Sequence, residues 1–232
     1  MNPSRAAILF STLFASAGSA ALAADPAHPA VVEIFQSQGC SSCPPANANL
    51  NAIAGRPDVL ALSFAVTYWD RLGWKDTFAH PAFTERQWEY SRAGERGNVS
   101  TPQVVVNGRG FLVGNRKGEL DAFIKRYDRG PGGPRIDTGA GRVRIGMAPK
   151  RRDANVWLVG YDPRTQQVPI RAGENGGRTL PHRNIVRTLH LLGKWNGPEA
   201  SFALRPLPNA AWRHAILVQD GPGGAILAAR KV

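Results

Sequence analysis

The chain has few of several residue types on which common folds and sites depend. Its 232 residues include two cysteines and two methionines, and no stretch approaches the ~18 to 20 consecutive apolar residues of a membrane-spanning helix. A single cysteine pair cannot build a framework of several disulfides, and it falls short of the four ligands of a structural zinc site. The sequence also lacks a glycine-rich phosphate loop, a serine-nucleophile elbow and a paired-carboxylate signature. The cysteine pair is therefore its main chemical feature.

Acidic residues are also scarce. The chain has 17 Asp and Glu against 29 Lys and Arg, a net charge of +12. Residues 1–134 carry 13 basic and 11 acidic residues, a net of +2, whereas residues 135–232 carry 16 and 6, a net of +10. No recognised nucleic-acid motif accompanies this charge, so we expect no nucleic-acid partner. A basic half favours weak association with anionic envelope surfaces.

The first residues have the pattern of a secretory signal peptide. Arg5 precedes a mostly apolar run, residues 6–15, and Ala21-Leu22-Ala23 is a small-x-small cleavage pattern. We expect residues 1–23 to be removed and the mature protein to be periplasmic or secreted. Such a compartment permits disulfides.

The mature chain is predicted to contain two domains. The charge balance changes near residue 134, and residues 129–134 (Arg-Gly-Pro-Gly-Gly-Pro) have the composition of a linker. Residues 30–129 are predicted to form an α/β domain. Residues 135–232 are predicted to form a small all-β, sandwich-like domain.

The first domain alternates strand and helix patterns. Residues 59–66 are nearly all apolar, which is typical of a strand buried on both faces, and Asn107-Gly108 is a strong hairpin signal. An i, i+3, i+4, i+7 repeat begins at Leu120 and predicts an amphipathic helix. The expected order is strand 30–36, helix 46–54, strand 59–66, helix 81–92, strands 103–106 and 110–113, and helix 120–127. This is the element order of the thioredoxin fold.

Beyond residue 134 the patterns are those of strands. Short alternating or apolar runs are separated by turn residues such as Asp162-Pro163 and Asn196-Gly197-Pro198. Strands are predicted at 143–147, 156–161, 185–195, 201–204, 214–219 and 225–229. This density of short strands is typical of a sandwich.

The two cysteines form one motif, Cys40-Ser41-Ser42-Cys43. Closing so short a loop stabilises a fold by only about 2 kcal/mol in the chain-entropy model, so such a disulfide is better suited to reaction than to bracing. Pro44-Pro45 is tolerated only in the first turn of a helix, and a helix N-terminus favours a thiolate. We expect Cys40 to be the exposed attacking sulfur and Cys43 to be the buried, resolving one. Two alternatives stay open: a locked structural disulfide, and a Cu(I) site with His80 as a third ligand.

Several motifs together resemble a family of secreted bacterial thioredoxin-like proteins of unassigned function. The resemblance is carried by residues 37–45 (Ser-Gln-Gly-Cys-Ser-Ser-Cys-Pro-Pro), 68–70 (Tyr-Trp-Asp), 73–76 (Gly-Trp-Lys-Asp) and 101–103 (Thr-Pro-Gln). In the second half it extends to residues 173–175, 178–180 and 184–187. It implies a thioredoxin-like fold and supplies no substrate.

The thioredoxin-like fold predicts where several further residues lie relative to the cysteines. The Thr101-Pro102 bond should be cis and face the cysteines, so Pro102 is predicted to shape a docking groove for a partner chain. The loop that holds Trp69 and Asp70 follows a buried strand and should lie on the same side of the sheet. Asp70 is a candidate proton acceptor from a thiol, although it also suits a turn cap. Glu33 is a weaker candidate proton carrier, one position away from the usual spacing.

Serine side chains and a second-half cluster complete the candidate set. Ser41 and Ser42 are predicted to hydrogen-bond a cysteine sulfur or to start the helix. Residues 173–175 with Arg178, His182 and Asn184 form a polar cluster that could face the cysteines, although a hairpin turn also accounts for it.

The sequence therefore favours a periplasmic thiol:disulfide oxidoreductase that acts on protein thiols or disulfides without a cofactor or metal. Its predicted catalytic residues are Cys40, Cys43 and Pro102. No motif encodes whether the pair oxidises, reduces or isomerises its partners. The alternatives are a Cu(I)-binding or copper-delivery protein and a non-catalytic envelope binding module on the same scaffold.

Overall fold

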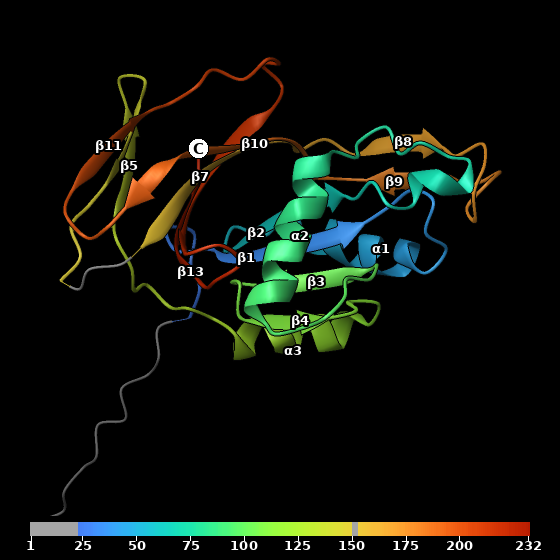
Figure 1. Ribbon diagram of the computed structural model, residues 1–232, viewed down its shortest axis with the longest axis horizontal. Coiled ribbons are helices and arrows are strands. Elements are labelled where there is room, and N and C mark those ends of the chain that lie inside the picture. The colour runs from blue at the N-terminus through green and yellow to red at the C-terminus, as the bar shows by residue number, and fades with distance from the viewer. Residues whose placement is uncertain (1–22, 150–152) are drawn as a thin grey trace, which may run out of the picture.

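The computed structural model describes residues 23–149 and 153–232 (Figure 1). Apart from Ala23, the predicted signal peptide lies outside the described residues. Within those residues no helix is both long and apolar enough to cross a membrane. The chain forms a mixed α/β structure around one large sheet.

The first half follows the predicted order of strands and helices. Its elements are β1 (Ala30–Gln36), α1 (Cys43–Ile53), β2 (Val59–Ala65), the 3-10 turn η1 (Asp70–Leu72), α2 (Pro81–Ala93), β3 (Gln103–Val106), β4 (Gly110–Leu112) and α3 (Lys117–Arg126). β1 and β2 are parallel, as their connection through α1 requires, and β3 runs antiparallel to β1. Every residue of β1, β2 and β3 is buried, which explains their continuous apolar character.

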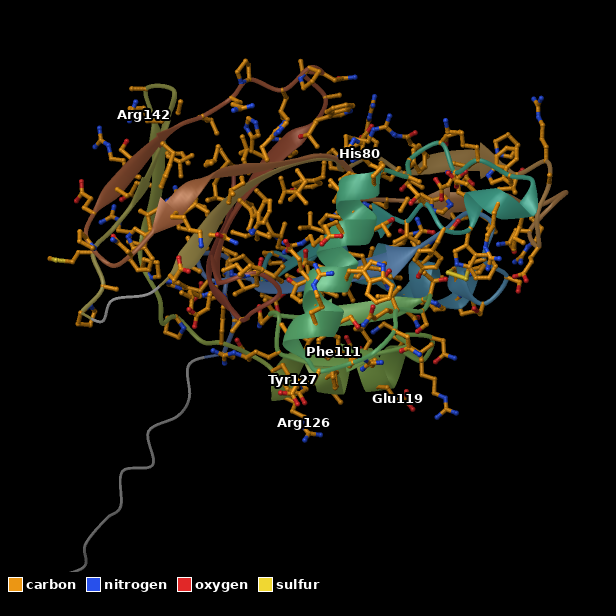
Figure 2. All side chains as sticks on the ribbon, in the orientation of Figure 1. His80, Phe111, Glu119, Arg126, Tyr127 and Arg142 are labelled. Atoms are coloured by element: carbon orange, nitrogen blue, oxygen red, sulfur yellow. A yellow bond between two sulfur atoms is a disulfide. The ribbon has the colours of Figure 1, made fainter. Side chains whose placement is uncertain are left out.

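The helices cover both faces of this sheet. Because side chains alternate along a strand, Val31 and Phe35 of β1 pack toward α2, whereas Val32 and Ile34 pack toward α1 and α3. Figure 1 shows α2 crossing the near side of the sheet and α3 beside β4 at its lower edge. Figure 2 shows side chains at the ends of α3, including Glu119 and Arg126, pointing away from the sheet.

The predicted hairpin between β3 and β4 turns at Asn107-Gly108, and both residues have positive φ. A Cβ at Gly108 would lie 2.3 Å from the carbonyl oxygen of Gly224, so this position requires glycine. The Asn107 side chain accepts from the backbone N–H of Val31 at 2.8 Å and donates to the carbonyl of Tyr127 at 2.8 Å. The turn therefore connects β1, α3 and the C-terminal part of the chain.

The second half consists of strands, and the sequence patterns did not predict three of them, at residues 136–139, 166–169 and 179–182. Its elements are β5 (Ile136–Gly139), β6 (Arg142–Ile145), β7 (Ala154–Asp162), β8 (Gln166–Pro169), β9 (Thr179–His182), β10 (Ile185–Trp195), β11 (Ala200–Ala203), β12 (Arg213–Asp220) and β13 (Ile226–Lys231). Four of them continue the sheet of the first half, in the order β13-β12-β7-β10-β2-β1-β3-β4.

The junction between the halves lies at β2 and β10. These strands pair in parallel at Ser63 and Ile185. The Ser63 N–H donates to the carbonyl of Asn184 at 2.9 Å, and the Asn184 side chain donates to the carbonyl of Ala61 at 2.8 Å. A single eight-stranded sheet thus runs through both predicted domains.

The expected sandwich in residues 135–232 therefore takes a different form. The three-stranded sheet β11-β6-β5 packs over the far part of the large sheet, with Val143, Ile145, Leu158 and Ile216 in their shared core. One layer of this sandwich is the β13-β12-β7-β10 end of the eight-stranded sheet. The sequence patterns assigned these four strands to a separate domain. Arg142 lies on the outer layer, in the upper part of Figure 2.

A buried ion pair links α2 to both halves of the sheet. Arg86 of α2 donates to Glu33 of β1 at 2.7 and 3.1 Å and to Gln219 of β12 at 3.1 Å. Tyr90 also donates to Glu33. Arg86 and Glu33 side chains are each 1% exposed, so neither charge has access to solvent. Each charge depends on the other for compensation.

Loss of one partner of this pair should be strongly destabilising. Arg86→Leu leaves the Glu33 carboxylate buried and unpaired, and we expect the free energy of unfolding to fall by about 3 to 5 kcal/mol in urea denaturation. The control is Arg92→Leu, which breaks an exposed pair with Glu85 and should cost no more than about 1 kcal/mol. Equal losses for the two variants would contradict this account.

Candidate functional site

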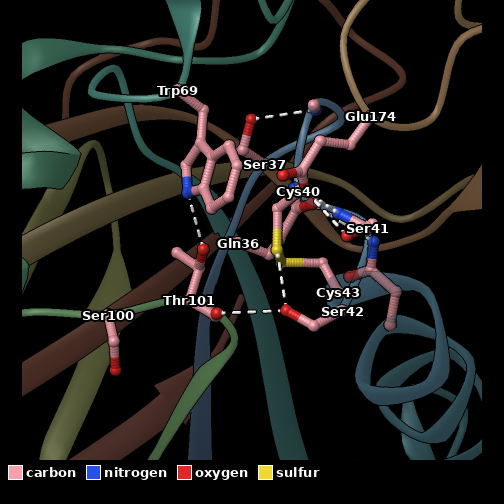
Figure 3. Close-up of a disulfide and its surroundings, with 12 residues drawn as sticks. Gln36, Ser37, Cys40, Ser41, Ser42, Cys43, Trp69, Ser100, Thr101 and Glu174 are labelled. Carbon is pink, nitrogen blue, oxygen red and sulfur yellow. Dashed lines mark hydrogen bonds between the residues drawn. A yellow bond between two sulfur atoms is a disulfide. The ribbon is translucent and has the colours of Figure 1, made fainter. Parts of the chain in front are cut away.

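The two cysteines lie where β1 leads into α1 and form a disulfide with a Cα–Cα distance of 5.4 Å (Figure 3). α1 begins at Cys43, and Pro44 and Pro45 occupy its first turn, where a proline costs no helical hydrogen bond. Leu50 and Ile53 then anchor the helix in the core beneath β1. The sequence thus fixes Cys43 as the first residue of the helix and Cys40 just before it.

The segment before β3 meets the cysteine motif from the other side. The Thr101–Pro102 peptide bond is cis, as predicted. Ser42 donates to the carbonyl oxygen of Thr101 at 3.4 Å, and its hydroxyl lies 3.3 Å from Cys40 Sγ. The structure therefore brings together the cysteines, Ser42, Thr101 and Pro102, all named from the sequence.

Trp69 is the third element of the site. Its ring N–H donates to Thr101 Oγ1 at 2.7 Å, and Figure 3 shows the indole beside the disulfide. A Cβ added to Gly39 would lie 3.8 Å from Trp69 Cβ, so the loop after β2 approaches the backbone that precedes Cys40. The predicted position of this loop near the cysteines is confirmed.

A loop from the second half covers the disulfide. We call residues 171–178, which join β8 to β9, the covering loop. Asn175 is fully buried, and its side-chain amide donates to the carbonyls of Gln38 at 2.9 Å and Cys40 at 2.8 Å. The Glu174 carboxylate accepts from the Ser41 N–H at 2.9 Å and from the Ser41 hydroxyl at 2.7 Å. The loop part of the polar cluster noted in the sequence therefore faces the cysteine motif, whereas Asn184 bonds to the backbone of β2.

Both sulfur residues are consequently buried. Cys40 is 0% and Cys43 is 1% exposed, so the expectation that Cys40 is exposed is wrong. The covering loop contributes to this burial together with Trp69 on the other side of the disulfide. The loop lies more than 130 positions along the chain from Ser41, and no local pattern places it there. Ser41 is likewise bonded to Glu174 instead of to a sulfur.

Gln38 is a central contact of the site that the sequence analysis missed. Its side-chain oxygen accepts from the Trp74 ring N–H at 2.9 Å, and its amide donates to Thr77 at 3.1 Å. Its backbone N–H donates to Asp76 at 2.7 Å. Burial raises the pKa of Asp76 to about 6, although that backbone N–H favours the carboxylate. Gln38 thus holds the loop after β2 against the cysteine motif.

A buried polar group lies on the side of α1 that faces β9. Asn47 follows Cys43 by one helical turn, and its amide donates to Gln36 at 3.2 Å and contacts His182 Nδ1 at 3.1 Å. His182 is 1% exposed. Desolvation lowers its pKa to about 4, so the imidazole is neutral at neutral pH. This contact ties the hairpin that carries the covering loop to the helix that carries Cys43.

Three residues predicted for the site serve elsewhere. Glu33 points toward α2, the face opposite α1, and its ion pair with Arg86 makes it unsuited to carry protons for the cysteines. Asp70 accepts from the backbone N–H of Asp76 at 3.1 Å and braces its own loop. His80 caps the N-terminus of α2 by accepting from Ala82 N–H. Across residues 23–149 and 153–232, no group of three or more His, Cys, Asp or Glu side chains is placed to hold a metal.

Fold and site together define a mixed α/β protein with a CxxC disulfide at the start of a helix. The model of the family described as "Protein of unknown function (DUF1223)" matches residues 31–219, and the chain belongs to this family. No curated protein matches the chain.

Two solved structures are similar. The X-ray structure of protein AGR_C_4864 from Agrobacterium tumefaciens is 32% identical, with a TM-score of 0.69 over 88% of this chain and 93% of that one. HBP35 of Porphyromonas gingivalis is 12% identical, with a TM-score of 0.56 over 88% of this chain and 74% of that one. At this identity the second likeness concerns the fold alone.

The neutral, buried His182 makes stability depend on pH. The unfolded chain binds a proton on this histidine below pH ~6.5, whereas the native state binds it only below pH about 4. His182 alone therefore makes stability rise with pH between these values, by roughly 3 kcal/mol in total. The raised pKa of Asp76 opposes this rise below pH about 6. His182→Gln, which keeps an acceptor for Asn47, should flatten this rise in urea denaturation measured from pH 4 to 7.

The matched control is His190→Gln at a half-buried position on β10, which should keep the wild-type rise. An unchanged rise in the His182 variant would show that another group causes it.

Proposed function

We propose that this protein is a thioredoxin-like thiol:disulfide oxidoreductase of the bacterial envelope and that Cys40 and Cys43 are its redox pair. One observation carries the proposal: the CxxC disulfide at the first turn of α1 lies against Thr101 and the cis Thr101–Pro102 bond. A short-loop disulfide contributes little stability, so its placement at a helix start beside the Thr101-Pro102 turn is better explained by reaction than by bracing.

The arrangement of the first half supports a thioredoxin-like scaffold. Its sheet order is β2-β1-β3-β4, with β1 parallel to β2 and antiparallel to β3. One helix covers one face and two cover the other. The cysteines leave the carboxyl end of β1, which is where sites form in open α/β sheets.

The reaction needs only partner thiols. A partner thiolate attacks Cys40 Sγ, a mixed disulfide forms, and the Cys40–Cys43 bond breaks with release of Cys43 as a thiolate that takes up a proton. The partner's second thiolate then attacks the partner's first sulfur in the mixed disulfide and releases Cys40 as a thiolate, which takes up the second proton. Two electrons and two protons pass from the partner dithiol to the protein. The reverse sequence transfers them to a partner disulfide, with Cys40 attacking and Cys43 resolving.

Reaction requires the covering loop to move, because Cys40 has no exposed surface. Displacement of Asn175 frees the carbonyls of Gln38 and Cys40, which become acceptors for a partner backbone. Only the hydrogen bonds and contacts of this loop need to break, while the sheet and α1 stay in place. Loops of this kind open at much lower free energy than the whole fold.

The envelope location rests on the predicted signal peptide and agrees with a disulfide-bonded pair. The proposed partners are protein thiols or disulfides. The basic second half favours weak association with anionic surfaces near them.

A second candidate is a non-catalytic binding module, and the burial of both cysteines favours it. Unlike the oxidoreductase, this candidate predicts that external thiols do not exchange with the disulfide of the native protein. The Cu(I) alternative would use the reduced pair without His80, and anaerobic titration with one equivalent of Cu(I) tests it.

Cysteine variants separate catalysis from bracing. Cys40→Ser should abolish reduction of insulin disulfides, because it removes the attacking sulfur. Cys43→Ser keeps that sulfur but lacks the thiol that resolves the mixed disulfide. This variant should therefore accumulate mixed disulfides, which are visible on non-reducing gels. The double variant is the control for trapping and should accumulate none.

Insulin reduction by Cys40→Ser at the wild-type rate would end the oxidoreductase proposal. Equal trapping by the Cys43→Ser and double variants would also contradict it.

A further inference from the structure

Glu174 places a negative charge beside the residue that would become a thiolate. Its carboxylate accepts from both the backbone N–H and the hydroxyl of Ser41, which follows Cys40 directly. The donors at Ser41 hold the pKa of Glu174 below its usual range, so this side chain is ionised at neutral pH. Figure 3 shows the carboxylate beside Ser41 at the start of the motif.

The charge is held in place by the rest of the covering loop. Asn175 binds the carbonyls of Gln38 and Cys40, and Arg178 donates to Asn175 Oδ1 at 2.7 Å. Gly173 approaches Gly39 so closely that an added Cβ would lie 3.7 Å from Gly39 Cα. The loop therefore meets residues 38–41 at several points, and Glu174 is fixed by its neighbours.

In a CxxC pair without such a loop, the free N–H groups around the helix start stabilise the attacking thiolate. Here the Ser41 N–H is already occupied by an anion. A thiolate at Cys40 would face a like charge and would have one fewer donor. Both effects disfavour the reduced, ionised state relative to the disulfide.

Resting on the proposed function, we infer that Glu174 is a positioning residue that disfavours the Cys40 thiolate and poises the pair toward the disulfide, so that the reduced protein is a reductant of its partners. The coupling is reciprocal: a closed loop favours the disulfide, and reduction favours an open loop by the same factor. The covering loop is therefore mostly closed while the disulfide is intact. After a partner dithiol has reduced the disulfide, the loop is open for a larger fraction of the time.

Other charges near the motif do not reverse this effect. Asp76 accepts from the Gln38 N–H and adds a second carboxyl on that side. The covering loop holds two arginines. Arg178 donates to Asn175 instead of to Glu174 or the motif, and Arg171 is exposed at the start of the loop. Trp69 and Thr101, which pack against the motif from the other side, are uncharged.

The test is Glu174→Gln, which removes the charge but keeps an oxygen that accepts from Ser41. The native disulfide is equilibrated with glutathione, the reductant, at pH 8, and the reduced fraction is measured. We expect the equilibrium constant for reduction to rise roughly threefold, equivalent to about 14 mV for a two-electron couple. In a Cys43→Ser background, the midpoint of the pH profile for Cys40 alkylation should move to lower pH by about one unit.

The matched control is Glu199→Gln, an exposed acid before β11, which should leave both readouts at the wild-type value. A purely structural role for Glu174 predicts no shift in either readout for the isosteric glutamine variant. If wild type equilibrates with glutathione but Glu174→Gln matches it in both readouts, this inference is overturned and the proposed function stands. If native wild type does not equilibrate at all, the proposed function fails and the inference fails with it.

Discussion

The arrangement of the site depends on one buried amide. The side chain of Asn175 satisfies the backbone carbonyls of Gln38 and Cys40, and burial makes both partners costly to leave unpaired. This contact closes a loop of the second half over a disulfide of the first half. The same loop contributes to the burial of Cys40 and brings Glu174 to Ser41. Under the proposed function, the loop must open locally before the disulfide can react.

The loop reaches the cysteines because one large sheet runs through both halves of the chain. β10 continues the sheet beside β2, and Asn184 bonds to the backbone of β2 at the junction. The hairpin β8–β9 precedes that junction directly, and His182 fixes it to α1 through Asn47. The second half is therefore joined to the cysteine-bearing half by a short connection and by these side-chain contacts.

The sequence predicts the first half well because local signals govern it. The apolar run of β2, the Asn107-Gly108 turn and the double proline after Cys43 each specify one local structure, and the observed elements follow them. The long-range contacts have no comparable local signal. The pairing of Ser63 with Ile185 and the contact of Asn175 with Cys40 join residues more than 120 positions apart. Burial of Cys40 could not be predicted for the same reason. Glu33 was a weaker candidate proton carrier from its spacing, and spacing alone could not identify Arg86 as its ion-pair partner.

The central claim is that the native protein exchanges its disulfide through local opening, and the kinetics of its reduction test this most directly. The rate of reduction by dithiothreitol should rise with reagent concentration and then reach a plateau set by loop opening. That plateau should exceed the global unfolding rate, measured separately in urea and extrapolated to water, by at least tenfold. A plateau equal to the unfolding rate would mean that the cysteines react only in unfolded chains, and it would contradict the account.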